Sequence, residues 1–177
     1  MKINNIIRKK LEKIKLLIMD VDGVLTSGYI LINSLGKEIK VFDVQDGFGL
    51  TLWRKAGLKS AIITAGMAPA VKYRADCLKV DKVYQHARDK LAAYNKLKSH
   101  FKINDSQICF IGDDLIDVPV LKKVGFSCAV PNGHDDMKGY VSYICKTPGG
   151  KGAVREVIDM ILKAKGVWYE VTKDYIG

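Results

Sequence analysis

The chain has 177 residues, 48% of them hydrophobic and 27% charged, with a formal net charge of +10 at pH 7. This length suits a single domain over residues 1–177, and no apolar stretch is long enough to cross a membrane, which argues against a membrane protein. The lysines are spread along helical stretches without an aromatic-interleaved patch. The sequence therefore argues against nucleic acid as a partner and favours an anionic small molecule.

The first 15 residues are basic and amphipathic, unlike a hydrophobic signal segment, so we expect a cytoplasmic protein. A helix over residues 3–14 would pack Ile6, Ile7 and Leu11 on the sheet. The cysteines lack the paired spacing of a metal site. We expect small core residues in a reducing compartment at all four positions: Cys77, Cys109, Cys128 and Cys145.

An apolar run over residues 16–19 ends in two carboxylates, Asp20 and Asp22, which are separated by one residue. A buried strand here would carry Asp20 to the carboxyl edge of a parallel sheet, where open α/β folds bind their ligands. Gly23 would allow a sharp turn, so that both carboxylates converge on one point and need a cation. The same pattern also occurs in ordinary turns and in calcium loops, but no Glu follows at the calcium-loop spacing.

Residues 29–42 predict a β-hairpin, because two apolar segments flank a turn-like segment with a glycine, 33–37. The hairpin, at about residues 28–42, carries more apolar surface than an exposed hairpin should. Two alternatives follow. The hairpin packs on its own domain, for example folded over the site as a flap in a monomer, or it meets copies of itself.

Thr64 ends a second apolar run, 61–63, and precedes Pro69, which suits the first turn of a helix. A hydroxyl and loop amides at a helix entrance suit an anionic oxygen. As a lone feature, a threonine in this position is more often just a strand-end residue.

Two further polar features follow. Lys90 lies near the start of an amphipathic helical stretch, where a lysine is often simply solvated. A strand over residues 108–111 then runs into a second acidic cluster. Within it, Asp114 and Asp117 are explicable as helix-start charges, and Asp113 is less readily explained in this way.

The predicted strands lie near residues 15–20, 59–64, 82–84, 108–112, 126–130 and 141–144, with helical stretches between them. This alternation predicts an α/β fold with a doubly wound, Rossmann-like parallel sheet and a protruding β-hairpin. A last helix with an apolar face ends at Gly166. The tail that follows, residues 167–177, is too aromatic for a plain disordered end.

In chain order the segments DVDGVLT, IIT, DK and GDDLID resemble the four motifs of the haloacid dehalogenase superfamily of phosphotransferases. The spacing, the early hairpin and the late segment GGKGAVREV look like one branch, the 3-deoxy-D-manno-octulosonate 8-phosphate phosphatases. The resemblance extends over nearly the whole chain. It implies a fold without a large cap domain and a magnesium-dependent phosphatase that acts on a keto-sugar acid phosphate through an aspartyl-phosphate.

The resemblance implies that Asp20 is the nucleophile and that Asp22 is the general acid and base. It also implies a Mg²⁺ ion held by the Asp20 carboxylate, the main-chain carbonyl of Asp22 and the Asp113 carboxylate. Hard oxygen ligands of this kind suit magnesium.

Four further residues complete the implied site. Lys90 would neutralise charge on the phosphate group, and Thr64 would donate a hydrogen bond to it. Asp114 and Asp117 would orient ligands or water from behind the metal ligands. A non-catalytic binding or assembly module is the alternative from another class, but a scaffold has no structural need for so many polar groups at strand and helix ends.

The segment 43–47 resembles the substrate loop of the branch: Asp43, Val44, Gln45, Asp46 and Gly47. Gln45 and Thr51 stand where the branch has arginines, and Ala65-Gly66 follows Thr64 where the branch has Gly-Arg. Arg74 stands where its guanidinium would reach a substrate carboxylate. A nine-carbon keto-sugar acid phosphate, or another small phosphate ester, is therefore an alternative substrate.

Members of the branch assemble as homotetramers, with their hairpins together at the centre and a neighbour closing each active site. The resemblance implies the same assembly here. It also implies that the tail after Gly166 docks on a neighbour and helps to cover the substrate there.

Overall fold

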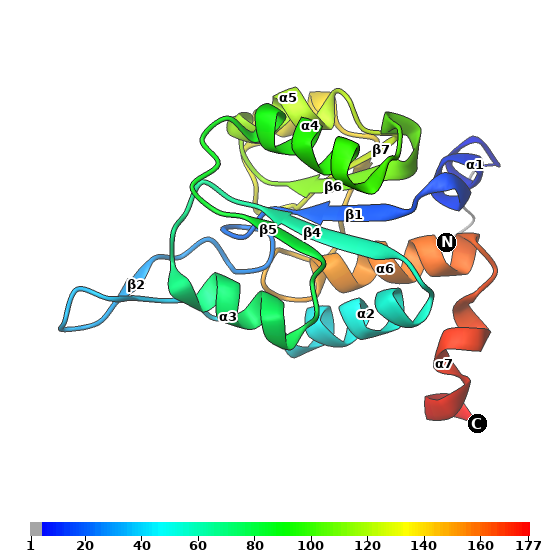
Figure 1. Ribbon diagram of the computed structural model, residues 1–177, viewed down its shortest axis with the longest axis horizontal. Coiled ribbons are helices and arrows are strands. Elements are labelled where there is room, and N and C mark those ends of the chain that lie inside the picture. Colours follow the sequence, from blue (N-terminus) through cyan, green and yellow to red (C-terminus); the bar gives the residue numbers. More distant parts are fainter. Residues whose placement is uncertain (1–4) are drawn as a thin grey trace.

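The computed structural model describes residues 5–177 and contains a six-stranded parallel sheet (Figure 1). The strand order is β5-β4-β1-β6-β7-β8. The strands are β1 (Leu16–Met19), β4 (Lys59–Ile63), β5 (Lys82–Tyr84), β6 (Ile108–Gly112), β7 (Phe126–Ala129) and β8 (Tyr143–Ile144). Each predicted strand is present, and the predicted doubly wound parallel sheet is confirmed.

Helices cover both faces of the sheet (Figure 1). One face carries α2 (Val44–Lys55), α3 (Pro69–Cys77) and α6 (Ala153–Ala164), and the opposite face carries α4 (Lys90–Phe101) and α5 (Val118–Leu121). Three short 3₁₀ segments lie in the connections: η1 (Asp105–Gln107), η2 (Leu115–Asp117) and η3 (Asp135–Tyr140). No helix among residues 5–177 is long and apolar enough to cross a membrane.

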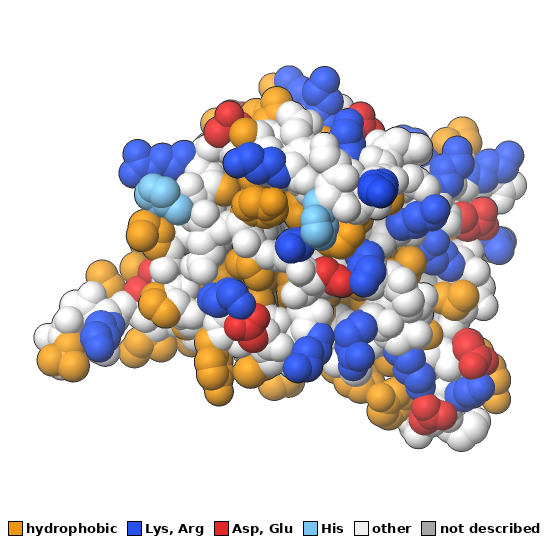
Figure 2. All heavy atoms as spheres, viewed as in Figure 1, with side chains coloured by type: hydrophobic (Ala, Val, Ile, Leu, Met, Phe, Trp, Pro, Cys, Tyr) orange, Lys and Arg blue, Asp and Glu red, His pale blue; other side chains and the backbone are white. Residues whose placement is uncertain are grey.

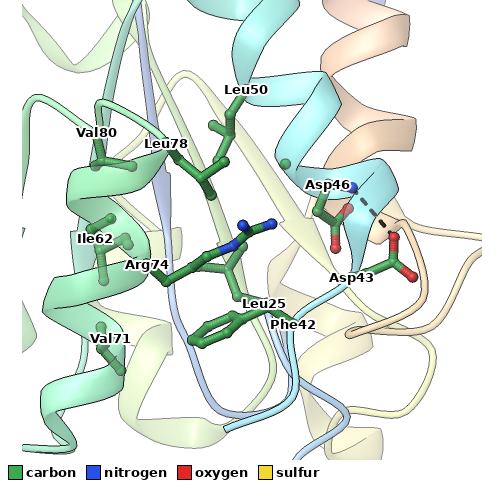
Figure 3. Close-up of a pocket in the computed structure, with 12 residues that line it drawn as sticks. Leu25, Phe42, Asp43, Asp46, Leu50, Ile62, Val71, Arg74, Leu78 and Val80 are labelled. Carbon is green, nitrogen blue, oxygen red and sulfur yellow. Dashed lines mark hydrogen bonds between the residues drawn. The ribbon is translucent and has the colours of Figure 1, made fainter.

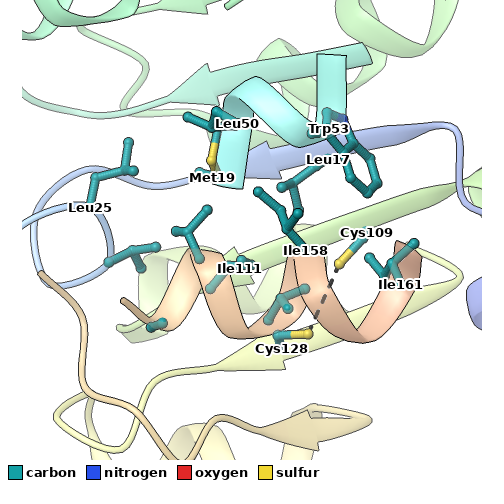
Figure 4. Close-up of a cluster of buried hydrophobic side chains, with 14 of the residues drawn as sticks. Leu17, Met19, Leu25, Leu50, Trp53, Cys109, Ile111, Cys128, Ile158 and Ile161 are labelled. Atoms are coloured by element: carbon teal, nitrogen blue, oxygen red, sulfur yellow. Dashed lines mark hydrogen bonds between the residues drawn. The ribbon is translucent and has the colours of Figure 1, made fainter. Parts of the chain in front are cut away.

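The core lies on both sides of β1, whose side chains alternate between the two faces. Leu17 and Met19 join the cluster under α2 and α6 (Figure 4), and Leu16 and Ile18 join the cluster under α4 and α5. The buried Cys109 and Cys128 thiols lie 4.0 Å apart in the first cluster. The expectation of a core position is wrong for Cys77, which is exposed because it lies on the solvent side at the end of α3.

The hairpin projects from the domain and consists of β2 (Leu31–Ile32) and β3 (Glu38–Ile39), which pair antiparallel (Figures 1 and 2). Its apolar side chains are exposed, including Tyr29 at 78% and Ile30 at 70%. Except for Phe42, which packs against the core at the base of the hairpin, they do not pack on their own domain. The alternative of a hairpin folded down as a flap therefore does not describe this structure. Its assembly with other copies stays a prediction.

Helices α1 (Asn5–Lys13) and α7 (Trp168–Ile176) both contact α6. The start of the predicted N-terminal helix lies outside the described residues. The predicted packing holds for the buried Leu11 and is wrong for Ile6, which is 68% exposed because it lies on the outer face of α1.

The C-terminal tail forms helix α7 (Trp168–Ile176), which folds back onto α2 and α6 of its own chain. Lys55 Nζ lies 2.5 Å from Asp174 Oδ2, and the rings of Phe48 and Tyr175 meet edge to face at 5.0 Å. Two aromatic residues of the tail therefore have partners within this chain, Tyr175 and Trp168, whose ring lies under Lys163 Nζ. Contact with a neighbouring copy stays a prediction.

Candidate active site

The candidate site lies at the carboxyl edge of the sheet, where the strand order reverses between β1 and β6. Asp20 follows β1, Asp113 follows β6 and Thr64 follows β4. The Asp20 amide still donates to the carbonyl of Ile111, at 3.1 Å, so the ladder fixes the direction in which Asp20 leaves the sheet. Open α/β sheets bind their ligands at this switch point.

Lys90 holds the carboxylate of Asp20. Its Nζ lies 2.5 Å from Asp20 Oδ2 and 2.6 Å from Asp117 Oδ1, and its side chain is only 1% exposed. The other Asp20 oxygen accepts a hydrogen bond from the Val21 amide at 2.6 Å. Asp89 caps α4 by accepting from the Ala92 amide at 2.9 Å, which fixes Lys90 at the first helical position. The alternative of a solvated lysine does not describe this residue.

Three carboxylates form a cluster beside Lys90, because oxygens of Asp20, Asp113 and Asp117 all lie within 4.8 Å of one another. Asp117 uses both of its oxygens, since Oδ2 accepts from the amides of Asp113 and Asp114 at 3.0 and 3.3 Å. Among residues 5–177, no donor reaches the carboxylate of Asp113. Asp113 and Asp20 are therefore the members best placed to hold a cation, and Asp117 orients them.

The cluster carries more negative charge than Lys90 offsets. Burial raises the pKa of Asp20 to about 6, and the charge of Asp117 adds to this while Lys90 opposes it. Burial, followed by the charges of Asp20 and Asp117, raises the pKa of Asp113 to about 8. Burial lowers the pKa of Lys90, but the two carboxylates outweigh this effect and the net shift is upward. A hard divalent cation would satisfy this set of oxygens.

Asp22 is not among the three clustered carboxylates, and its side chain is 40% exposed. Its carboxylate accepts a hydrogen bond from Lys40, which the sequence analysis did not select. Asp22 and Thr64 border the same glycine, because a Cβ on Gly66 would lie 3.3 Å from Asp22 Oδ2 and 3.4 Å from Thr64 Oγ1. Thr64 Oγ1 also accepts from the Gly66 amide at 3.1 Å.

The loop after Asp20 is held by a second group of residues that the sequence analysis also missed. Asn132 donates from Nδ2 to the carbonyl of Gly23 at 3.0 Å and accepts from the Gly149 amide at 2.7 Å. The Gly150 amide donates to the carbonyl of Val24 at 2.9 Å. The glycine pair in GGKG was a visible signal, but nothing in the sequence marked Asn132 as its partner.

The residues of the predicted substrate loop have different surroundings. Asp43 caps α2 by accepting from the Gln45 amide at 2.6 Å, and Val44 is 78% exposed. Asp46 is buried, and its Oδ1 accepts from the Arg155 amide near the start of α6, at 2.8 Å. Asp46 therefore ties α2 to α6 and does not join the cluster of carboxylates.

Arg74 points from α3 into a small cavity beneath α2 (Figure 3). Gly47 allows this close approach, because a Cβ on Gly47 would lie 2.6 Å from a terminal nitrogen of Arg74. Among the described residues, Arg74 Nε and Asp46 Oδ2 are buried without hydrogen-bond partners. The structure thus gathers Arg74 with the loop at the start of α2, away from the cluster. Asp114, also outside the cluster, is exposed and caps η2.

The sheet with its clustered aspartates and buried lysine defines an α/β enzyme. The sequence pattern of the haloacid dehalogenase-like hydrolases matches residues 71–158. The 3-deoxy-D-manno-octulosonate 8-phosphate phosphatase KdsC of Escherichia coli (strain K12) is 41% identical over 157 residues, which cover 89% of this chain and 84% of the relative. The chain therefore belongs to the haloacid dehalogenase-like hydrolase family, in the branch that contains these phosphatases, as its motifs predicted.

Solved structures agree with this assignment. The 3-deoxy-D-manno-octulosonate 8-phosphate phosphatase of Moraxella catarrhalis, in complex with a magnesium ion, a phosphate ion and a KDO molecule, superposes with a TM-score of 0.94. It is 40% identical, and the match covers 97% of this chain and 98% of that one. The cobalt-bound phosphatase from Haemophilus influenzae superposes with a TM-score of 0.87 at 36% identity, over 90% and 93% of the two chains.

Proposed function

We propose that this protein is a magnesium-dependent phosphatase that hydrolyses 3-deoxy-D-manno-octulosonate 8-phosphate to 3-deoxy-D-manno-octulosonate and phosphate. The observation that carries the proposal is the buried Asp20 carboxylate, 2.5 Å from Lys90 Nζ and beside Asp113 at the switch point of the sheet. The names of the relatives support the choice of substrate. The cytoplasmic location expected from the sequence is part of this proposal.

The donor set fits a magnesium ion. The carboxylates of Asp20 and Asp113 and the main-chain carbonyl of Asp22 would hold it, and the raised pKa of Asp113, caused by burial and by neighbouring carboxylates, indicates negative charge that a cation would offset. When bound, the cation reduces the repulsion between an anionic phosphate and the carboxylate that attacks it.

The residues divide the reaction into two displacements. An oxygen of Asp20 attacks phosphorus, the bond from phosphorus to the sugar oxygen breaks, and Asp22 gives its proton to the departing sugar oxygen. Asp22 then takes a proton from water, which attacks the aspartyl-phosphate, releases phosphate and restores the Asp20 carboxylate. Lys90 holds Asp20 in place during the attack, and Thr64 donates a hydrogen bond to a phosphate oxygen.

Recognition of the sugar acid is assigned to the loop 43–47 and Arg74, whose guanidinium suits a carboxylate. Gln45 and Thr51 stand where the resemblance gives arginines, so the alternative substrate is a nine-carbon keto-sugar acid phosphate or another small phosphate ester. Thr51 Oγ1 donates to the carbonyl of Gly47 at 3.2 Å within α2, so it offers no equivalent of a guanidinium.

Phosphate release from a panel of keto-sugar acid phosphates, with magnesium or with a chelator, tests the proposal. We expect the eight-carbon substrate to be hydrolysed with the highest kcat/KM, and only with the metal present. Asp20→Asn should abolish turnover, and equal activity in this variant would refute the mechanism. Hydrolysis of unrelated phosphate esters alone would refute the substrate.

We also propose a homotetramer in which the projecting hairpins meet. The support is the row of exposed apolar side chains on a hairpin that does not pack on its own domain. Sedimentation of the protein and of an Ile30→Lys variant tests this, since a charge at the contact should dissociate the assembly. A monomer in the unsubstituted protein would refute it.

A further inference from the structure

Lys40 lies one residue after β3, where the hairpin returns to the domain, and its side chain is only 2% exposed. Lysine is rarely buried to this extent unless it is paired, because a desolvated ammonium without partners is costly. Its Nζ contacts the carboxylate of Asp22 and lies 2.5 Å from Glu38 Oε1. The buried ammonium therefore joins the base of the hairpin to the loop that follows β1.

The carboxylate of Asp22 depends on this contact. Among the described residues, Lys40 is the one donor that reaches it. Without Lys40, a side chain that is 40% exposed would be free to change rotamer and turn towards solvent. The contact with Lys40 therefore holds Asp22 in a single orientation.

The two lysines of the site contact different carboxylates. Lys90, on α4, contacts Asp20 and Asp117, and Lys40, on the hairpin, contacts Asp22 and Glu38. Because Glu38 shares the ammonium of Lys40, Asp22 does not face the whole positive charge alone. The nucleophile is thus held by the core of the domain, and the proposed acid and base is held by the hairpin.

We propose that Lys40 is a positioning residue that holds the Asp22 carboxylate where it protonates the departing sugar oxygen, and that Glu38 holds Lys40 in turn. The proposal rests on the phosphatase function proposed above. It gives the hairpin a part in the reaction within each chain, in addition to any part in assembly. Loss of Lys40 should therefore impair the step that needs a proton, and spare steps that do not.

The test compares kcat/KM for two esters in the same Lys40→Met preparation. A sugar phosphate needs a proton on its leaving oxygen, whereas p-nitrophenyl phosphate leaves as a stable phenolate. We expect Lys40→Met to lower kcat/KM for the sugar phosphate at least about tenfold, and that for the aryl ester less than about threefold. The ratio of the two values does not depend on the fraction of folded protein.

Two further variants sharpen the comparison. Lys37→Met removes an exposed lysine from the same hairpin and should leave both values unchanged. In an Asp22→Asn background, Lys40→Met should cause no further loss, because a residue that acts only through Asp22 has nothing left to position. Glu38→Gln should change the ratio in the same direction as Lys40→Met and by a smaller factor, and it serves if Lys40→Met fails to fold.

Two results would overturn the positioning role and leave the phosphatase function standing. One is an equal loss of kcat/KM on the two esters in Lys40→Met. The other is a double variant in which the losses of Lys40→Met and Asp22→Asn add in full. Absence of hydrolysis of any phosphate ester by the unsubstituted protein would refute the proposed function itself, and the role of Lys40 with it.

Discussion

Replacement of Lys90 by Met tests the electrostatic reasoning about the site, because it removes a buried cation from between two carboxylates. The Lys90 and Asp117 side chains are 1% and 0% exposed, and the two ion-pair distances are 2.5 and 2.6 Å. Removing one partner of a buried pair leaves charge without compensation, and we expect a loss of about 3 kcal/mol in the free energy of unfolding at neutral pH. For a chain of this size that lowers Tm by roughly 6 to 12 °C.

Lys98→Met is the matched control, since Lys98 lies on the same helix and pairs with Asp105 at 2.8 Å on the surface. An exposed pair of this kind contributes about 0 to 1 kcal/mol. Urea unfolding of both variants, in chelator to exclude metal binding, measures the difference directly. Equal losses in the two variants would refute the conclusion that the Lys90 pair is sensitive because it is buried.

Three further outcomes follow from the geometry. Burial raises the pKa of Asp46 from 3.8 to about 6. Between pH 3.8 and about 6, the folded state keeps a proton that the unfolded state has released, so the free energy of unfolding falls as pH rises, by at most about 3 kcal/mol in total. Asp46→Asn should remove this part of the pH dependence, as measured by urea unfolding at several pH values. Asp113→Asn should weaken magnesium binding in calorimetry at least about tenfold, while the exposed Asp114→Asn should not; equal affinities would contradict the assignment of the ligand. Gly23→Ala places a Cβ 2.0 Å from Asp113 Oδ2 at a φ of +85°, so it should impair both folding and magnesium binding. The control is Gly36→Ala, where φ is +71° and nothing lies within 4 Å of the added Cβ. It should lower the free energy of unfolding by about 1 kcal/mol and leave magnesium binding unchanged.

Much of the fold and the centre of the site could be predicted because their signals are local. A short apolar run that ends in a polar residue marks both a buried parallel strand and the residue at its carboxyl end. That single pattern located β1 with Asp20, β4 with Thr64 and β6 with the acidic cluster. The resemblance to the family implied that Asp20 and Asp113 share one site, and the parallel pairing of β1 with β6 brings the two carboxylates together.

Other features could not be predicted because burial of a polar side chain depends on which segments meet. Lys40, just after the hairpin strand β3, is indistinguishable in the sequence from a solvated lysine, because only the return of the hairpin to the domain brings it to Asp22. Asp46, in a segment that resembles a substrate loop, proves to cap α6 far along the chain. Ile6 has the spacing of a core residue, yet the helix that carries it turns that position outward.

The orientation of Asp113 shows this dependence most clearly, because it requires glycines, which have no Cβ, at several neighbouring positions. A Cβ on Gly23 would collide with the Asp113 carboxylate, and a Cβ on Gly133 would lie 2.5 Å from the Asp113 carbonyl. A Cβ on Gly149 would in turn lie 1.6 Å from the carbonyl of Gly23. Each of these glycines, taken alone, predicts only a turn. Together they let three backbone segments approach one another around Asp113. The position of this proposed metal ligand therefore depends on contacts between backbone segments that no local pattern of residue types can specify.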